Sequence, residues 1–414
     1  MRLLHRALTL LVIAVPVLFI SGTWLPELNR VMHTGTTYRD SLQYYTGAYL
    51  VLTDQPERLY DLETHRALQD IWLPAEHRPH LDFRFLPFLS PPFVAWALAP
   101  LASLGLPMFY AVTGLGNWAL LAILLGALRR LTSAWEEVWR LAALAFCLLW
   151  IPIVWTILQG QVSILLAVSF MLGFLALRSG KDATAGIVLA LLWAKPQYAV
   201  LVLPSLLAWK RWRAAGSFAA TSALLLLVSL AVVGLDGFLG YVGLLRRIET
   251  MGPLYAMFPA SYHTLSGLLL RFFGIKGVPW LLLSGLLVGI TLWSFAKQGF
   301  HPRSYALMIF MTVLVSPHTH IQDLAVLVPA IVLGGEALKA HRKLALLWTT
   351  LWSLVAMSFY VLAATPKFLQ DSPLFTVSAM ALSILTLFWA RESSAPSWTS
   401  DVAPAERPAA THGR

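Results

Sequence analysis

Charged side chains are scarce in this sequence. Asp, Glu, Lys and Arg make up 12% of the 414 residues, whereas they make up about 25% of an average soluble domain. Hydrophobic residues make up 58%. So few charged groups do not provide the polar surface that a soluble fold needs around so much apolar volume. The composition therefore excludes an ordinary soluble domain and predicts an all-α protein that crosses a membrane many times.

Cysteine and the common catalytic and nucleotide-binding motifs are also missing. The one cysteine, Cys147, lies inside an apolar run, which excludes a disulfide framework and a cysteine metal site. No GxxxxGK(S/T) loop is present, which argues against an ATP-driven transporter. No GxSxG, HExxH or Cys–His arrangement is present either. Ordinary hydrolase chemistry therefore lacks its residues.

The net charge of +10 raises the question of a nucleic-acid partner. Most Lys and Arg residues, however, lie in the termini and in short connections between apolar runs. This distribution follows the positive-inside rule, by which the cytoplasmic connections of a membrane protein carry its cations. We therefore expect membrane lipids around the chain and no nucleic acid.

Apolar runs near the ~20 residues that a spanning helix needs follow one another along the chain. They predict about twelve crossings, at 7–24, 107–128, 140–157, 162–178, 183–194, 198–209, 215–234, 278–296, 303–316, 322–338, 344–364 and 373–390. The first 22 residues resemble a signal peptide without a small-residue cleavage site, so we expect a retained signal anchor. With the N terminus inside, the inner face holds the basic segments 128–140, 178–182, 210–213, 297–303, 339–343 and the tail from Arg391.

Residues 83–107 do not fit this alternation, because a full crossing there would invert every later span. Their prolines would interrupt a spanning helix, so we expect a re-entrant or membrane-surface element. The long outer loops are then 25–83, with two surface helices, and 235–277, and the working face is the outer one. One transmembrane domain covers 1–390, and the Ser-, Pro- and Ala-rich tail 391–414 is expected to be disordered.

The stretch RDSLQYYTGAYLVL places Asp40 ahead of a helix-length run in the first outer loop. Two interpretations are open. Asp40 and Gln43 have the spacing of a capping box, in which a short polar side chain satisfies N–H groups at a helix start. Alternatively, Asp40, Gln43 and Tyr44 share one helix face. A carboxylate on such a face at the bilayer boundary can take a proton from an acceptor hydroxyl.

Further polar motifs occupy the predicted outer connections. Because the connections at one end of a bundle converge, we expect them to line one cavity with the first loop. Their candidate residues are Gln159 and Gln161 in QGQ, Lys195 in AKPQ, His263 in YHTLSG, and His318, His320 and Asp323 in SPHTHIQD.

Lys195 interrupts the positive-inside pattern between two short apolar runs. An intramembrane charge of this kind is a functional candidate, although a lysine can also extend its stem to reach the interface. His318 and His320 with Asp323 resemble metal ligands. Two histidines two residues apart, with no third ligand fixed by spacing, are a weak metal signal. We therefore expect a polar cavity lining and no metal.

Taken in order, several motifs resemble the integral-membrane glycosyltransferases of the GT-C class, and most closely glycosyltransferase family 87. They are RDSLQYYTGAYLVL, LYD at 59–61, FRFLPFLSPPFVAWALAPL, QGQVSILL, LALLWAKPQYAVLVLPSLLAWKRWRA and SPHTHIQDLAVL. Two positions depart from the family pattern. Leu89-Ser90 precedes Pro91-Pro92 where members often have a tyrosine, and Gln322 stands where a tyrosine often precedes the aspartate.

The resemblance implies a transferase that moves a hexose, most simply mannose, from a polyprenyl-phosphate donor to a glycolipid or glycan acceptor at the outer face of the cell membrane. It implies inversion at the sugar, no cofactor, and Asp40 as the general base. Arg39 and Lys195 would meet the donor phosphate, and the other polar candidates would contact substrate. The alternative is a secondary transporter or flippase of a lipid-linked sugar, which predicts an internal repeat that this sequence does not show.

Overall fold

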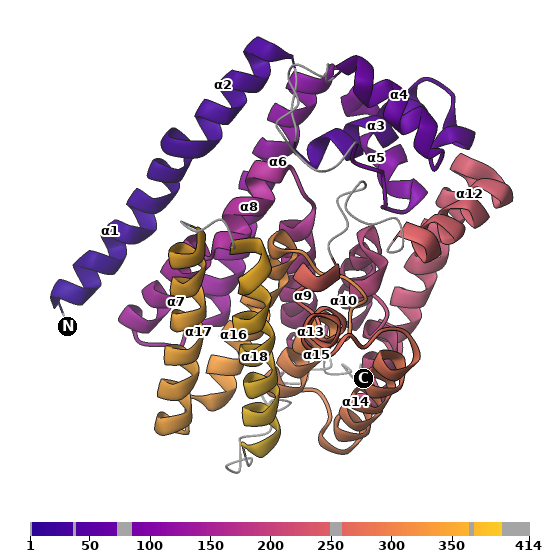
Figure 1. Ribbon diagram of the computed structural model, residues 1–414. Coiled ribbons are helices and arrows are strands. Elements are labelled where there is room, and N and C mark those ends of the chain that lie inside the picture. The colour runs from indigo at the N-terminus through magenta and orange to yellow at the C-terminus, as the bar shows by residue number, and fades with distance from the viewer. Residues whose placement is uncertain (1, 36–38, 73–84, 249–258, 364–367, 391–414) are drawn as a thin grey trace, which may run out of the picture.

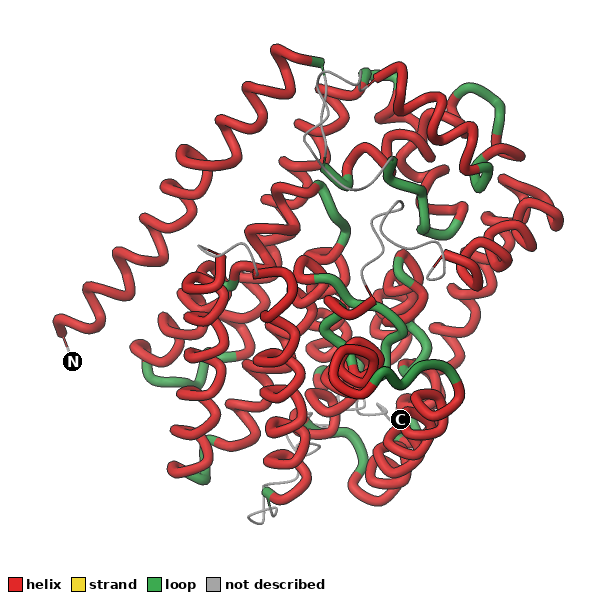
Figure 2. Tube along the Cα trace, in the orientation of Figure 1, coloured by secondary structure: helices red, strands yellow, loops and turns green. Residues whose placement is uncertain are grey.

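The computed structural model describes residues 2–35, 39–72, 85–248, 259–363 and 368–390. Across these ranges the chain forms helices and connecting turns and no strand (Figures 1 and 2). The prediction of an all-α membrane bundle is therefore confirmed. The predicted tail 391–414 lies outside the described residues.

The helices follow from long runs of apolar residues with few interruptions. They are α1 (Arg2–Phe19), α2 (Leu25–Thr34), α3 (Ser41–Leu52), α4 (Leu62–Trp72), α5 (Pro92–Ala102), α6 (Leu106–Leu131), α7 (Glu137–Leu149), α8 (Ile151–Gln159), α9 (Ser163–Arg178), α10 (Asp182–Ala190), α11 (Val202–Ala208), α12 (Trp212–Ile248), α13 (Leu265–Phe273), α14 (Val278–Gln298), α15 (Pro302–Leu314), α16 (Leu327–Leu338), α17 (Arg342–Ala363) and α18 (Phe368–Trp389). Short helical turns are η1 (Ile20–Trp24), η2 (Pro56–Arg58), η4 (Leu191–Ala194), η5 (Pro196–Tyr198), η7 (Pro259–Ser261) and η8 (Ile321–Val326).

The first predicted outer loop begins later than the hydropathy indicates. A π-helical turn joins α1 to α2, so the first helix continues to Thr34 instead of ending near residue 24. Within α12, Gly234 is non-helical, with φ of 69° and ψ of 179°, and separates two helical segments. The first segment ends at the predicted end of the span 215–234, and the second occupies the start of the predicted outer loop as far as Ile248.

Six described helical segments are long and apolar enough to cross a membrane, or seven if the bent pair α7 and α8 forms one span. The six are 6–34, 106–131, 212–247, 278–298, 321–338 and 342–361. The remaining predicted spans correspond to shorter helices, so the number of twelve stays a prediction. Helix α5 has 11 residues and a length of ~16 Å, about half of the ~30 Å hydrocarbon core. It is too short to cross alone.

Helices α3, α4 and α5 form a group at one end of the bundle (Figure 1). Helix α3 packs against α5, and α5 packs against α12. Gln69 of α4 links this helix to α3 and to the segment before α5. Its amide donates to Thr46 Oγ1 at 3.0 Å and to the Leu86 carbonyl at 2.8 Å. Its Oε1 accepts from the Leu86 N–H at 2.9 Å. The two helices predicted in the first outer loop are thus present and tied together.

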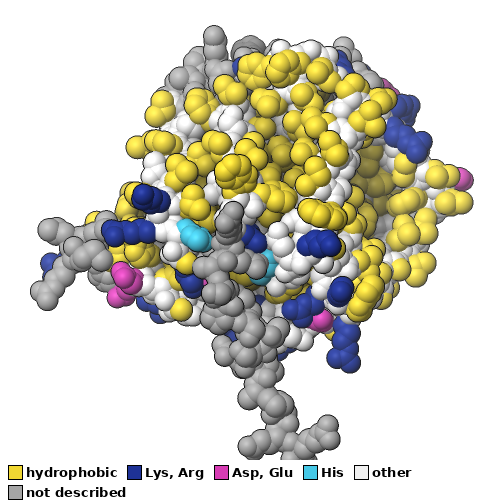
Figure 3. Space-filling model, turned by 90° about the horizontal axis from the view of Figure 1, so that it is seen from below, with side chains coloured by type: hydrophobic (Ala, Val, Ile, Leu, Met, Phe, Trp, Pro, Cys, Tyr) yellow, Lys and Arg dark blue, Asp and Glu magenta, His cyan; other side chains and the backbone are white. Residues whose placement is uncertain are grey.

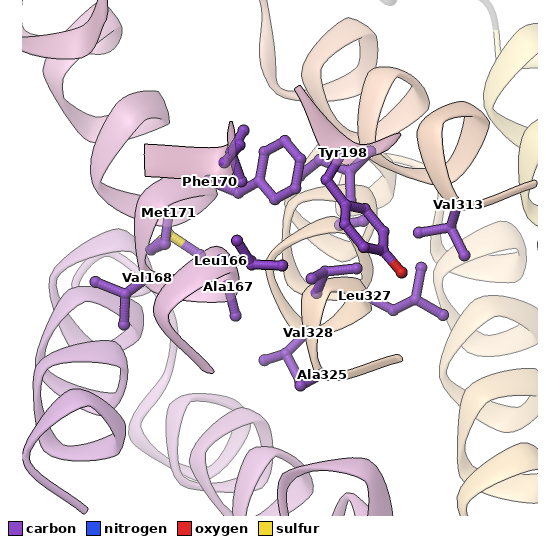
Figure 4. Close-up of a cluster of buried hydrophobic side chains, with 14 of the residues drawn as sticks. Leu166, Ala167, Val168, Phe170, Met171, Tyr198, Val313, Ala325, Leu327 and Val328 are labelled. Carbon is purple, nitrogen blue, oxygen red and sulfur yellow. The ribbon is translucent and has the colours of Figure 1, made fainter. Parts of the chain in front are cut away.

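The core lies below this group, around α9 and the segment that runs from η8 into α16. Buried side chains from these elements and from α15 meet there (Figure 4). The labelled residues Phe170, Tyr198 and Leu327 are all fully buried. This packing fixes the chain on both sides of η8, which carries the candidate residue Asp323.

The basic connections predicted for the inner face contact one another. Arg211 Nη1 lies 3.4 Å from Asp182 Oδ1, and its guanidinium lies 5.0 Å from the centre of the Phe300 ring. Arg303 donates a hydrogen bond to the carbonyl of Ala390. Lys and Arg side chains also gather on the side of the molecule seen from below (Figure 3). The predicted inner segments 178–182, 210–213 and 297–303 therefore meet at one end of the bundle.

Cysteine labelling tests which end faces outward. On the predicted outer side, Ser41 is buried and cannot serve as a labelling site, whereas Glu63 on α4 is exposed. The predicted inner residues Ser133 and Ser179 are exposed as well. We expect a membrane-impermeant maleimide to label Glu63→Cys in intact cells and to label Ser133→Cys and Ser179→Cys only after permeabilisation. The native Cys147 is buried and serves as the unlabelled background. Labelling of Ser133→Cys in intact cells would invert the assignment of faces.

Candidate active site

Asp40 lies at the start of α3, but its side chain does not cap the helix. Its Oδ2 instead accepts hydrogen bonds from Gln161 Nε2 at 2.6 Å and from Gln322 Nε2 at 3.1 Å. The backbone N–H of Asp40 donates to Gln159 Oε1 at 3.2 Å. The capping interpretation is therefore wrong, because the carboxylate binds residues far away in sequence and leaves the helix N–H groups to other partners.

The carboxylate of Asp40 is enclosed by protein while the residue keeps a partly exposed surface. Burial raises the pKa of this carboxyl above its ordinary value, and the hydrogen bond from Gln161 and the charge of Lys195 oppose that rise. A carboxylate with a raised pKa binds a proton more readily than an exposed one. The site thus holds a partly accessible carboxylate whose pKa is raised.

A tight turn brings the two glutamines of QGQ to Asp40. Helix α8 ends at Gln159, and Gly160 turns the chain in a left-handed conformation with φ of 67°. A Cβ on Gly160 would lie 2.7 Å from the Cβ of Ser41, the residue that follows Asp40. Glycine is therefore required here both for the turn and for the close approach of α3.

This close approach predicts the effect of Gly160→Ala. We expect the free energy of unfolding to fall by ~1–2 kcal/mol for the left-handed backbone alone, and by more because Ser41 must move. Gly180→Ala is the matched control, since Gly180 has φ of 70° and open space around the position of a Cβ. Thermal unfolding of the two variants measures the difference, and equal losses would show that the contact with Ser41 is unimportant.

Lys195 and Asp323 form a buried ion pair next to this cluster. Lys195 lies between η4 and η5, at the break caused by Pro196, and its Nζ donates to Asp323 Oδ1. Ser163 Oγ donates to the same oxygen at 2.7 Å, and the His320 N–H donates to Oδ2 at 3.2 Å. The alternative that Lys195 extends to the membrane interface is therefore wrong in this structure.

The ion pair and Asp40 are connected through η8, because Gln322 and Asp323 are consecutive residues with opposite partners. The Gln322 carbonyl also accepts from Thr156 Oγ1 at 2.9 Å. One short turn thus joins the first outer loop to Lys195. The structure brings together Asp40, Tyr44, Gln159, Gln161, Lys195 and Asp323, as predicted.

The three candidate histidines lie on the Asp323 side of the site. The N–H of His263 donates to the Thr319 carbonyl at 2.9 Å, and the ring centres of His318 and His320 are 6.3 Å apart. Burial lowers the pKa of His263 to about 3 and that of His318 to about 4, and it also lowers the pKa of His320. Near pH 7 these rings are neutral hydrogen-bonding groups. In the described part of the chain, no group of three His, Cys, Asp or Glu residues is arranged to hold a metal.

Arg39 and Gln43 do not join the cluster in the way predicted. Arg39 Nε lies 3.0 Å from Glu27 Oε1 of α2, and Arg30 contacts the same oxygen at 2.8 Å. Arg39 therefore forms an ion pair with Glu27. Gln43 is half-buried on α3, and only its backbone N–H contacts Asp40, through the carbonyl at 3.1 Å.

Comparison with known families gives one match, which covers several of the segments that form this site. The model of glycosyltransferase family 87 matches residues 88–317, which is more than half of the chain. The chain is a member of glycosyltransferase family 87. No curated protein and no solved structure shows significant similarity. The family match contains Gln159, Gln161, Lys195 and His263, whereas Asp40 and Asp323 lie outside it and join the site through the fold.

Proposed function

We propose that this family 87 glycosyltransferase transfers mannose from a polyprenyl-phosphate donor to a glycolipid or glycan acceptor. The reaction inverts the sugar, and Asp40 is the general base. The transfer takes place at the outer face of the cell membrane. Membership of the family supplies the class of reaction, and the proposal adds the donor, the acceptor, the geometry and the base.

The observation that carries this proposal is the environment of Asp40. A buried carboxylate normally forms an ion pair or caps a helix. This one accepts only neutral amide donors from described residues and keeps a partly exposed surface. It can therefore take up a proton during a reaction without breaking an ion pair or freeing a helix end.

Atoms and charge balance in this mechanism. The acceptor hydroxyl gives its proton to the Asp40 carboxylate, and its oxygen bonds to the anomeric carbon from the face opposite to the phosphate. The bond between that carbon and the phosphate oxygen breaks, and polyprenyl phosphate leaves with the electron pair. The reaction needs no nucleotide, redox partner or cofactor.

The leaving phosphate requires positive charge, which the proposal assigns to Lys195. Its ammonium group has three N–H donors, and Asp323 accepts one of them. A phosphate oxygen can therefore bind the same ammonium group while the ion pair persists. Asp323 orients the ammonium, and the neutral rings of His263, His318 and His320 offer hydrogen bonds to the sugar.

The placement on the outer face rests on the two ends of the bundle. The basic connections meet at one end, as the contact of Arg211 with Asp182 shows, while Asp40 and Lys195 belong to connections predicted for the other. Positive connections stay in the cytoplasm, so the Asp40 end faces outward. A lipid-linked donor would present its phosphate at the headgroup level of that side.

Product formation in a defined system tests the proposal. The purified protein in lipid vesicles receives radiolabelled polyprenyl-phosphate mannose, glucose or arabinose, together with an acceptor lipid and glycan pool. We expect labelled product from the mannosyl donor, and none from vesicles without protein. Labelled product from another sugar donor alone would replace mannose. Movement of the intact donor across the bilayer without product would favour the flippase alternative.

A further inference from the structure

Both hydrogen bonds to the Asp40 carboxylate end on one oxygen. Gln161 and Gln322 donate to Oδ2, and no described residue donates to Oδ1. The two amides reach Asp40 from opposite parts of the chain, one after α8 and the other in η8. Among the described residues, the carboxylate is thus held through one oxygen, and Oδ1 is the oxygen that faces no described donor.

An amide side chain can turn by half a rotation and present its oxygen where its nitrogen was. If Gln161 turned in this way, its Oε1 would face Asp40 Oδ2 and repel it. Tyr44 favours the observed orientation, because its phenol donates to Gln161 Oε1 at 2.8 Å. In the turned amide the phenol would accept from Nε2 instead, and Oε1 would face the Asp40 carboxylate. The phenol and the carboxylate together therefore direct the amide nitrogen of Gln161 toward Asp40.

Tyr44 itself has a fixed position. It is buried on α3, and its ring meets that of Phe88 edge to face with 6.2 Å between centres. A Cβ on Gly47, one turn further along α3, would lie 2.8 Å from the Phe88 ring, so the helix and the ring are in close contact. The phenol therefore starts a chain of contacts, from Tyr44 through Gln161 to Asp40.

We propose that Tyr44 and Gln322 are positioning residues of the general base. Tyr44 sets the orientation of the Gln161 amide, and Gln322 supplies the second donor, so that Asp40 Oδ2 is held and Oδ1 faces the acceptor hydroxyl. This rests on the proposed role of Asp40 as the base. It reassigns Tyr44 and Gln161, which the sequence placed among the substrate-binding residues, and adds Gln322.

The charged and titratable groups around Asp40 determine how such residues can be tested. Those facing it are Lys195, His320 and Asp323, together with the Tyr44 phenol. None of them changes in a Gln322 variant. Loss of an N–H donor to an ionised carboxylate destabilises the ionised form, so the pKa of the base rises. The acid limb of the rate profile then moves to higher pH.

Tyr44→Phe tests the first positioning residue. We expect kcat to fall about 10-fold and KM to stay within about twofold of the wild-type value, because the charge-assisted hydrogen bond from Gln161 to Asp40 is weakened. We also expect the acid limb to move up by about one pH unit. Tyr45→Phe is the control, since Tyr45 follows Tyr44 on α3 and its ring centre lies 4.8 Å from that of Trp72. It should keep the wild-type rate and profile.

Gln322→Leu and Gln322→Glu test the second positioning residue, Gln322. Leu removes the donor, and we expect the acid limb to rise by about one pH unit. Glu keeps the shape but places a second carboxyl near Oδ2, so the acid limb should rise further. Infrared titration of the carboxyl band, with the spectrum of Asp40→Asn subtracted, follows the protonation of Asp40 without any substrate and remains informative where turnover is lost.

The outcomes separate this inference from the proposed function. A slow Asp40→Asn protein together with unchanged profiles in Tyr44→Phe, Gln322→Leu and Gln322→Glu would refute the positioning role and leave the base in place. A fast Asp40→Asn protein would remove the base, and the inference with it. A fall in thermal stability without a shift in either titration would make both residues structural only.

Discussion

Replacement of Asp40 by Asn should slow sugar transfer by about 10²–10⁴-fold and leave the protein folded. Asn has nearly the shape of Asp, and its amide oxygen can still accept from Gln161 and Gln322. It cannot take the proton of the acceptor hydroxyl. Initial rates of transfer from labelled polyprenyl-phosphate mannose, measured over a range of acceptor concentrations, should show the loss in kcat.

The direction of the change in stability of Asp40→Asn can also be predicted. Burial raises the pKa of Asp40 in the folded protein above its unfolded value. The folded state therefore binds the proton more tightly, and the free energy of unfolding falls as pH rises through the interval between the two pKa values. Asn resembles the protonated form at every pH. The midpoint temperature of thermal unfolding of Asp40→Asn at neutral pH should thus equal that of the wild type or lie slightly above it.

Asp61→Asn is the matched control for this change. Asp61 lies in the same outer segment and does cap a helix, since it accepts from the Glu63 N–H at 3.1 Å and from Thr64 Oγ1 at 2.6 Å. Asn caps about as well as Asp, so this variant should keep both its rate and its stability. Near wild-type transfer by Asp40→Asn and a slow Asp61→Asn would move the base to Asp61.

Hydropathy was sufficient to predict the class of fold, because lipid requires each spanning segment to satisfy its own backbone hydrogen bonds. It could not place the end of α2. There the chain stays helical after the apolar run, as far as Thr34, and Gly35 in a left-handed conformation ends the helix. The bilayer thickness sets a lower bound on helix length and no upper bound.

The candidate site shows a similar division. Clustering of Asp40 with the QGQ motif and of Lys195 with Asp323 could be predicted, because connections at one end of a bundle converge. The partners of individual side chains could not. Spacing suggested a cap for Asp40, but its side chain forms no cap hydrogen bond. The family resemblance placed Arg39 at the donor phosphate, and in the structure Arg39 forms an ion pair with Glu27.

Gln322 shows what kind of signal was missing. It stood out in the sequence only as a departure from the family pattern, beside the aspartate of the late motif. Its contact with Asp40 joins residues 282 positions apart. Such a contact depends on how η8 is held, including the bond of Thr156 to the Gln322 carbonyl, and no local pattern encodes it.

Lys195→Ala should differ from the Asp40 variant by losing stability as well as activity. It leaves the Asp323 carboxylate buried without its cation, and removal of one partner of a buried ion pair typically costs about 3–5 kcal/mol. The side chains of the pair are 13% and 2% exposed, so solvent can do little to replace the lost partner. Arg66→Ala is the control. Arg66 and Asp70 form an exposed pair with 3.8 Å between Nε and Oδ2, and its loss should cost less than about 1 kcal/mol.

A double variant separates the structural part of Lys195 from its part in the reaction. Lys195→Met with Asp323→Asn removes both charges, while the Asn oxygen can accept from the His320 N–H and the Asn amide can donate to Ser163 Oγ. We expect most of the lost stability to return, because no unpaired charge remains buried. Transfer should nevertheless stay about 10- to 150-fold slower, the equivalent of a missing charge-assisted contact of about 1.5–3 kcal/mol with the donor phosphate. A stable double variant with the wild-type kcat would show that the ion pair only holds η8 in place, and the cation for the phosphate would then have to come from another residue.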